Sequence, residues 1–446
     1  MNSKHNIHQK VTLTPSSLQT GTNFRSSIKE LKQYSLQSDF LRKTSGTMLA
    51  KIVIGILGAL GSILLARLLG PDARGTFGIA LQLTTFGVQI GCLGLHSSNL
   101  FYSAKDSTKV PTIVGNSLIL SIVLGIVVIV LMSVFFLFFP SIRPLDGTIY
   151  LLSLLAIPFG IVYLLVQNVL PGIQDIQSYN YSEIAFRGIG VVLFIIVILL
   201  FHSTSIELVY CTTFVAPLLV SSWIVWKLRN FGTPTTSLPE IKNSISYASR
   251  VYVSMIFAFV MFKGNLFIIK EMLGVTQAGY YSVVMNIADL FTLISASIGM
   301  ILFSKSSSME NNRQRWKMTI KSAVLCAGIL LLSVVIFYWN DYLLVTLLFG
   351  KEFSEAVAPC NYLLIGIIFI GVQTIFMQYL ASIGLPKITL YLWGIGSILT
   401  VILNYVFIQK YGLNGASIAS SISYCVFTVA VFICASHYGR KEIVNV

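Results

Sequence analysis

The chain has 446 residues, of which 55% are hydrophobic and only 10% are charged, and its mean hydropathy is +0.81. Because soluble domains carry about 25% charged residues, this composition excludes a soluble globular protein and indicates an integral membrane protein. The formal net charge is +14; it follows the distribution that membrane topology imposes on lysine and arginine, so it gives no argument for nucleic acid binding.

The chain begins with a polar, basic segment over residues 1–46, for which we expect a cytoplasmic amino-terminal tail. This segment contains no apolar stretch of the kind found in a cleavable signal peptide. We therefore expect the first membrane helix to act as the signal for insertion.

Apolar segments long enough to cross a membrane follow the tail, with mostly short connections between them. About 20 residues suffice for one span, and the sequence predicts twelve spans, at 47–69, 76–100, 112–139, 148–170, 180–201, 206–227, 247–272, 277–302, 320–339, 356–383, 388–409 and 413–437. A linker-like stretch over 228–246 contains two prolines and a threonine cluster near the midpoint. The sequence therefore predicts an all-α polytopic membrane protein, with a first six-helix bundle over 47–227, a cytoplasmic linker over 228–246, a second six-helix bundle over 247–437 and a short cytoplasmic carboxyl terminus over 438–446.

The junction between the first two spans contains Gly-Pro-Asp at residues 70–72, a helix-breaking cluster. The residues around it recur in the second half at one offset of 204 positions: Leu69, Gly70, Gly75, Phe77 and Gln82 match Leu273, Gly274, Gly279, Tyr281 and Asn286. An offset close to half the chain length is what an internal duplication produces. We expect a shared structural turn motif formed by Gly70, Pro71, Gly75, Gly274 and Gly279.

Lysine and arginine are unevenly distributed between alternate connections. If the amino terminus is inside, the inner segments hold the seven basic residues of the tail and most of the others. The outer turns hold six, namely Arg67, Arg74, Arg143, Lys270, Lys351 and Lys410. Because cytoplasmic loops carry an excess of lysine and arginine, the sequence predicts a multi-pass protein of the inner (cytoplasmic) membrane with both termini in the cytoplasm.

Several ionisable residues lie within the predicted spans. A charge at the bilayer centre costs roughly 2.5–3.5 kcal/mol, so it should face a protein interior or a water-filled cavity. The cations are Lys51, Arg187, Arg250 and Lys263, and the carboxylates are Glu183 and Asp289. The cations outnumber the carboxylates, which favours an anionic ligand.

Structural roles stay open for each of these charges. The two cations near cytoplasmic helix ends, Lys51 and Arg250, could extend to the membrane surface. Glu183 and Arg187 have the spacing of an ion pair on one helix face. Lys263 lies deep in its span, where its structural alternative is a pair with Asp289 on the next helix.

The sequence contains no motif of a soluble enzyme. Phosphate-binding loops, nucleophile elbows and zinc-protease motifs are absent, and so are clusters of His, Cys and carboxylates with metal spacing. Six cysteines lie mostly within apolar runs and are interpreted as packing residues. We therefore expect no catalytic residue, no metal and no cofactor.

The run SDFLRKTSGTMLAKIVIGILGALGSILLARLLGPDARGTFGIA (Ser38–Ala80) resembles the amino-terminal signature of polysaccharide repeat-unit flippases. These flippases belong to the multidrug/oligosaccharidyl-lipid/polysaccharide exporter superfamily. The resembling features are a basic preamble, a first span that ends in ARLLGP, then Gly75 and the aromatic Phe77. The second half echoes them at Ile268–Asn286.

The resemblance implies two six-helix bundles related by a pseudo-two-fold axis along the membrane normal, around a central cavity that opens to each side in turn. It implies the translocation of undecaprenyl-diphosphate-linked oligosaccharides, precursors of O-antigen, capsule or exopolysaccharide, from the cytoplasmic to the outer leaflet. The implied partners are this substrate, membrane lipids and other glycan assembly proteins, but not nucleic acid.

A pyrophosphate head group needs fixed cations in a wet cavity, which agrees with the charge balance of the spans. We expect contacts with the substrate from Arg187, Lys263, Arg250, Lys51 and Asn265. We expect Asp289 and Glu183 to be coupling or counter-ion groups. An alternative is an exporter of drugs or other small molecules like those of the multidrug branch; because its cargo is mostly cationic, it should show the opposite charge balance. A membrane-embedded glycan polymerase or ligase is a third class, and it would need a large charged outer loop.

Overall fold

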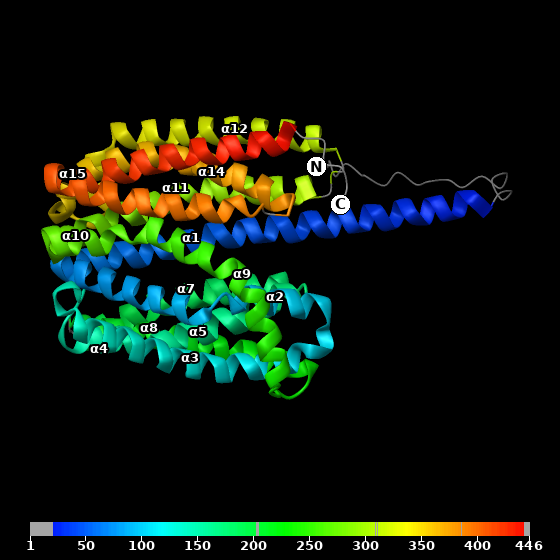
Figure 1. The fold of residues 1–446 in the computed structure, drawn as a ribbon, viewed down its shortest axis with the longest axis horizontal. Helices are drawn as coiled ribbons and strands as arrows, with labels where there is room; N and C mark the ends of the chain where they lie inside the picture. Colours follow the sequence, from blue (N-terminus) through cyan, green and yellow to red (C-terminus); the bar gives the residue numbers. More distant parts are fainter. Residues whose placement is uncertain (1–20, 202–204, 308, 310, 385, 441–446) are drawn as a thin grey trace, which may run out of the picture. The chain divides into compact units, whose positions relative to one another are not determined.

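The computed structural model describes residues 21–201, 205–307, 309, 311–384 and 386–440. Within these residues every regular element is a helix (Figure 1), as the sequence predicts. The helices are α1 Gly21–Cys92, α2 Leu95–Lys105, α3 Val110–Phe138, α4 Gly147–Leu155, α5 Ile157–Gln167, α6 Val169–Gly172, α7 Ile176–Phe201, α8 Ile206–Leu228, α9 Leu238–Lys263, α10 Asn265–Leu273, α11 Val275–Ser307, α12 Asn312–Trp339, α13 Asp341–Phe349, α14 Val357–Ser382 and α15 Ile388–Arg440, with short 3-10 helices at Ser107–Lys109, Pro140–Ile142, Arg229–Phe231 and Lys351–Ala356. Residues Met48–Val446 form one compact unit.

The described helices confirm a multi-pass membrane protein. Nine of them are long and apolar enough to cross a membrane, and the bent pair Tyr252–Lys263 and Asn265–Leu273 makes a tenth candidate. Two of the nine are far longer than the roughly 20 residues of one crossing. Each of these two contains a glycine with a non-helical backbone, Gly70 in α1 and Gly412 in α15.

Three of the predicted spans are interrupted in the structure. The span predicted over 76–100 breaks at Leu93 and Gly94, which have φ of 46° and 75°, so its end becomes α2. The span predicted over 148–170 consists of α4, α5 and α6 in succession. The helices α9 and α10 meet at 42° around Gly264. Apolar composition does not reveal such breaks, because a bent and a straight helix bury similar residues.

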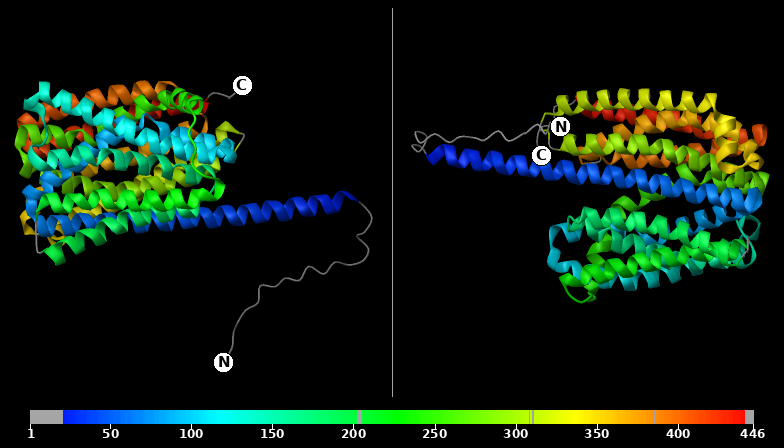
Figure 2. Two further views of the ribbon diagram at one scale, coloured as in Figure 1. Left: turned by 90° about the horizontal axis from the view of Figure 1, so that it is seen from below. Right: turned by 180° about the vertical axis from the view of Figure 1, so that it is seen from behind.

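The membrane helices pack in two sets that follow chain order (Figures 1 and 2). In the first set, α5 packs against α3 and α8, and α8 packs against α7; in the second, α14 packs against α11, α12 and α15. α9 contacts both sets, through α2 and through α15. Buried tyrosines lie within the sets, Tyr210 on α8 and Tyr281 and Tyr379 on α11 and α14. After the central linker, α9 therefore packs against helices of both sets.

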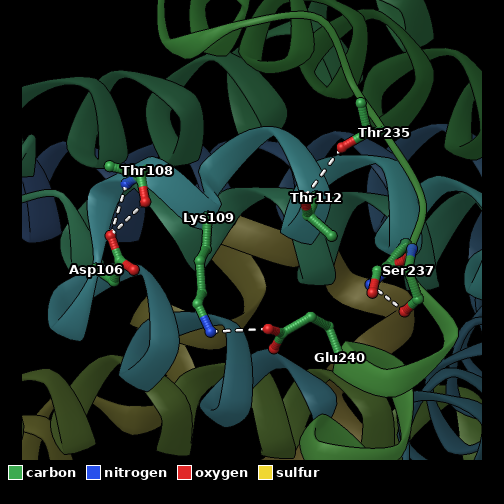
Figure 3. A network of polar contacts seen from close by, with 8 residues as sticks. Asp106, Thr108, Lys109, Thr112, Thr235, Ser237 and Glu240 are labelled. Atoms are coloured by element: carbon green, nitrogen blue, oxygen red, sulfur yellow. Dashed lines mark hydrogen bonds and ion pairs between the residues drawn. The ribbon is translucent and has the colours of Figure 1, made fainter.

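The segment that joins α8 to α9 is bound to the start of α3 (Figure 3). Lys109 Nζ lies 2.7 Å from Glu240 Oε1. The hydroxyls of Thr112 and Thr235 lie 3.0 Å apart, and the backbone N–H of Thr235 donates to Pro111 O at 3.2 Å. These bonds fix the path of the linker and the position at which α9 begins.

Candidate functional site

Two opposite charges meet between α9 and α11. Lys263 Nζ donates to Asp289 Oδ2 at 2.9 Å and to Oδ1 at 3.2 Å. Lys263 is the last residue of α9, and Asp289 lies near the middle of α11. The Lys263–Asp289 ion pair, which the sequence left open as the structural alternative to a substrate contact, is therefore present. However, the two side chains keep exposed fractions of 28% and 58%, so neighbouring side chains cover the pair only in part.

The second intramembrane carboxylate belongs to a polar network between α5 and α7. Glu183 Oε1 accepts hydrogen bonds from Gln167 Nε2 at 2.6 Å and from the Tyr163 hydroxyl at 3.2 Å. Gln167 also donates to Ser182 Oγ at 3.1 Å. Within the described residues Glu183 forms no ion pair with Arg187, so the structure does not show the pairing that the spacing of these residues allowed.

The other described cations flank this network. Lys51, on α1, has Glu183 as an attractive electrostatic neighbour. Arg187 lies one turn after Glu183 on α7 and has an exposed side chain. Among the residues that the structure describes, Arg187 forms no ion pair. Its exposed guanidinium is thus accessible for contacts with a ligand.

The first span of α1 lies between the helices that carry these charges. A Cβ on Gly188 of α7 would touch Leu57 of α1 at 3.9 Å, and Leu293 of α11 lies against Gly55 of α1. Gly188 directly follows Arg187 in the sequence, and Leu293 lies one turn after Asp289. One span therefore contacts a charged helix from each half of the chain.

The structure gives Asn265 contacts within the protein, while its predicted contact with the substrate stays a prediction. This residue is only 3% exposed, and its Nδ2 donates to the Tyr281 hydroxyl at 2.9 Å and to Ser420 Oγ at 3.4 Å. The Nδ2 group therefore braces α10 against α11 and α15, whereas Oδ1 has no hydrogen-bond partner within the described residues. The side chain of Arg250 lies outside the part of the chain that the structure describes.

Glycines related by the repeat meet each other directly. A Cβ on Gly75 would overlap Val275 O and stand 2.9 Å from Gly279 N. A Cβ on Gly279 would overlap Pro71 O and stand 3.1 Å from Gly75 N. We refer to Pro71, Gly75, Val275 and Gly279 as the glycine contact. Each half presents the same segment to the other, at a backbone distance that only glycine permits.

The turns before the glycine contact have the same conformation in both halves. Gly70 has φ 72° and ψ 178°, and Gly274 has φ 92° and ψ 177°. A positive φ strongly favours glycine, which explains why both positions hold it. Two further residues at the same offset, Asp72 and Thr276, share a hydrogen bond between their side chains.

Two arginines on either side of Gly70 donate hydrogen bonds to neighbouring oxygen atoms. Arg67 Nε donates to Leu348 O at 2.8 Å, at the end of α13, where backbone carbonyls lack partners within the helix. Arg74 is 4% exposed and donates to Ser62 Oγ at 3.1 Å. The sequence analysis considered both arginines only as basic residues of the outer turns.

The sequence interpretation missed the partners of Glu183 and of Asp72. Gln167 and Tyr163 are polar residues in an apolar run, which is a detectable signal, but the sequence does not show that they face Glu183. Thr276 could have been found by extending the repeat comparison, since it stands 204 positions after Asp72 although the residue types differ.

Membrane helices with exposed charges at mid-span, and two halves joined by repeated glycines, define a multi-pass membrane transporter. The profile of the polysaccharide biosynthesis protein family matches residues 64–358. The chain belongs to this flippase family of the multidrug/oligosaccharidyl-lipid/polysaccharide exporter superfamily, and the resemblance seen in the sequence is confirmed. Its members are transporters, not enzymes.

Individual relatives agree with this assignment. A Shigella flexneri protein named "Putative O-antigen transporter" is 24% identical over 380 residues, which cover 80% of this chain and 88% of that protein. An inward-facing multidrug resistance MATE family transporter superposes with a TM-score of 0.71 at 16% identity, covering 87% of this chain and 97% of that one. The lipid II flippase MurJ, in an inward closed conformation, also gives 0.71 at 14% identity, covering 87% of each chain. The two solved structures establish the fold alone.

Proposed function

We propose that the protein is a flippase that moves undecaprenyl-diphosphate-linked oligosaccharide repeat units from the cytoplasmic to the outer leaflet. The observation that carries this proposal is the exposure of Lys263, Asp289 and Arg187 at the middle of apolar helices. Because a charge facing lipid at this depth is costly, these side chains face a water-filled space between the helices. A wet space with an excess of cations suits a pyrophosphate head group.

The two exposed cations have complementary chemistry toward a pyrophosphate. The planar guanidinium of Arg187 suits two parallel hydrogen bonds to phosphate oxygens, and the ammonium of Lys263 acts as a point charge. Lys51 adds a third cation on α1, next to Glu183. Arg187 belongs to the first half of the chain and Lys263 to the second, so a ligand between them would contact both halves, as alternating access requires.

The glycine contact suits the outer gate of such a transporter. Dividing the two longest helices at Gly70 and Gly412 turns the ten candidate spans into twelve, the number predicted from the sequence. Twelve spans with cytoplasmic termini would place the turns at Gly70 and Gly274 outside. The closed glycine contact would then belong to a state open toward the cytoplasm, and a pseudo-two-fold axis would relate the two six-helix bundles.

The relatives support a lipid-linked glycan as cargo. The name of the Shigella flexneri relative refers to O-antigen, which makes an O-antigen precursor the first substrate to test. A multidrug exporter is the second candidate, because the fold resembles a multidrug transporter as closely as it resembles a lipid II flippase. The excess of intramembrane cations disfavours it.

Reconstitution into proteoliposomes tests the function directly. A fluorescent undecaprenyl-diphosphate oligosaccharide, loaded into one leaflet, should become accessible to a membrane-impermeant quencher on the other side only when the protein is present. A fluorescent cationic dye supplied in the same vesicles should not be transported. Dye transport without movement of the glycan lipid would favour the multidrug alternative and contradict the proposal.

Topology provides an independent prediction. In a background without the native cysteines, Asp72→Cys and Lys351→Cys should react with an impermeant thiol reagent added to intact cells, because both positions are exposed and lie in turns assigned to the outside. Arg229→Cys, also exposed but next to the linker, should be protected until the cells are opened. The reverse labelling pattern would exclude cytoplasmic termini.

A further inference from the structure

A cavity of about 380 Å³ is lined by residues from both halves of the chain. Leu83 and Phe86 of α1 and Phe136 of α3 form one wall, and Phe267 and Ile268 of α10 form the other. Ligand pockets typically enclose roughly 300–1,000 Å³ and are mostly apolar with a few polar groups. The volume and the lining of this cavity match that description.

The cavity opens where the protein faces the bilayer. Tyr405, on the spanning helix α15, lines the cavity and is 57% exposed. Ile142, in the short 3-10 helix after α3, also lines it and is 49% exposed. The acyl chains around α15 therefore have access to the cavity beside Tyr405.

Two charged residues stand at the rim of the cavity. Lys270 Nζ donates to Arg143 O at 3.2 Å and lies 3.4 Å from Glu271 Oε2. These contacts are long, and an ammonium carries three donors, so one donor of Lys270 remains available. Arg143 pairs with Asp146 close by. The rim thus carries one cation and one carboxylate, a balance that suits neither a purely anionic nor a purely cationic head group.

We propose that this cavity binds one acyl chain of a zwitterionic phospholipid, with the phosphate next to Lys270 and the head-group ammonium next to Glu271. The apolar walls select a lipid chain, and the balanced rim selects phosphatidylethanolamine over an anionic lipid. With the topology of the proposed function, Lys270 lies at the outer side of the membrane, so the lipid would come from the outer leaflet; this detail rests on the proposed function, whereas the binding site itself does not. Because the walls come from both halves, a bound chain stabilises the arrangement in which the halves meet at the glycine contact.

Native mass spectrometry of the full-length protein, extracted from vesicles of defined composition, tests the proposal. From vesicles with equal amounts of phosphatidylethanolamine and phosphatidylglycerol, the wild-type protein should retain one phosphatidylethanolamine preferentially, by about tenfold, the ratio that corresponds to 1.4 kcal/mol. Ile268→Trp should lose this lipid because the larger ring fills the cavity. Ile336→Trp is the matched control, since Ile336 is 55% exposed on α12, remote in sequence from the cavity, and it should retain the lipid.

A rim variant keeps the test independent of any folding defect in the wall variant. Lys270→Ala/Glu271→Ala should reduce the preference for phosphatidylethanolamine to about one while a lipid chain is still retained. Equal retention by wild type and Ile268→Trp would overturn the site, and an unchanged preference in the rim variant would overturn the head-group assignment. Preferential retention of phosphatidylglycerol, or of polyprenyl phosphate added to the same vesicles, would also overturn it. These measurements report binding, so they stand whether or not the glycan-lipid transport assay succeeds.

Discussion

Gly75→Ala and Gly279→Ala should each reduce glycan-lipid translocation by about 5–150-fold, because a single methyl group at either position prevents closure of the glycine contact. The added Cβ would overlap a backbone carbonyl of the other half, Val275 O or Pro71 O. A backbone carbonyl in a helical turn cannot rotate away as a flexible side chain can. Overpacking of this kind costs about 1–3 kcal/mol, which shifts a two-state equilibrium by about 5–150-fold. The expected shift is toward separated halves at this end.

A cross-link measures the closure separately from transport. Asp72 and Thr276 share a side-chain hydrogen bond across the two halves, so D72C/T276C in a cysteine-free background should form a disulfide. Addition of Gly75→Ala should sharply reduce the yield of that disulfide. Gly328→Ala is the control, because a Cβ at Gly328 of α12 meets nothing within 4 Å. Full cross-linking and normal transport in the Gly75→Ala variant would show that the contact is not a gate.

The helical architecture could be predicted from the sequence because hydropathy and glycine position determine it directly. The predicted breaker at residues 70–72 corresponds to the non-helical Gly70, and its repeat corresponds to Gly274 in the same conformation. The break at Leu93 and Gly94 could not be predicted in this way. Leu93 is an apolar residue in an apolar run, and it adopts a positive φ only because the packing of the neighbouring helices imposes it.

The arrangement of the charges was predictable only in part. The sequence indicated a pair of Lys263 and Asp289 across adjacent helices as the structural alternative to a substrate contact, since insertion of an unpaired charge is costly. It did not identify Gln167 as the partner of Glu183, because the sequence does not show that an amide on α5 faces a carboxylate on α7. Asn265 shows a second limit of the sequence. Its position beside Lys263 suggested a shared role, but the bend at Gly264 turns the two side chains to different surroundings.

The reciprocal contact of Gly75 and Gly279 lies beyond what a repeat can show. An offset of 204 positions indicates that two segments have the same structure, but it does not indicate that they touch. They touch because each segment begins a helix at the seam between the halves, where small residues allow backbones to approach. A repeat that includes glycines at helix starts is therefore a reason to look for contact across a pseudo-two-fold axis.

Removal of the Lys263 ammonium should reduce translocation about ten- to hundredfold. Hydrogen bonds that involve a charged group contribute about 1.5–3 kcal/mol, and each 1.4 kcal/mol corresponds to a factor of ten in affinity. Lys263→Ala should therefore weaken binding of the pyrophosphate lipid, measured as the concentration required for half-maximal translocation.

Arg187→Ala should have a similar effect, and Arg187→Lys should recover only part of the activity because the planar fork is lost. Lys317→Ala removes an exposed charge from α12 and should leave transport unchanged.

The ion pair with Asp289 supplies the test that separates a binding role from a structural one. If Lys263 serves only to neutralise Asp289, the loss of either residue leaves an unpaired charge, and Lys263→Ala/Asp289→Ala should regain transport. If Lys263 binds the head group, Asp289→Ala frees the ammonium and should preserve binding, while the double variant stays as defective as Lys263→Ala. The same comparison applies to Arg187→Ala/Glu183→Ala, although Glu183 is already satisfied by Gln167 and Tyr163. We expect no recovery in either double variant, because the proposed function uses these cations to bind the head group.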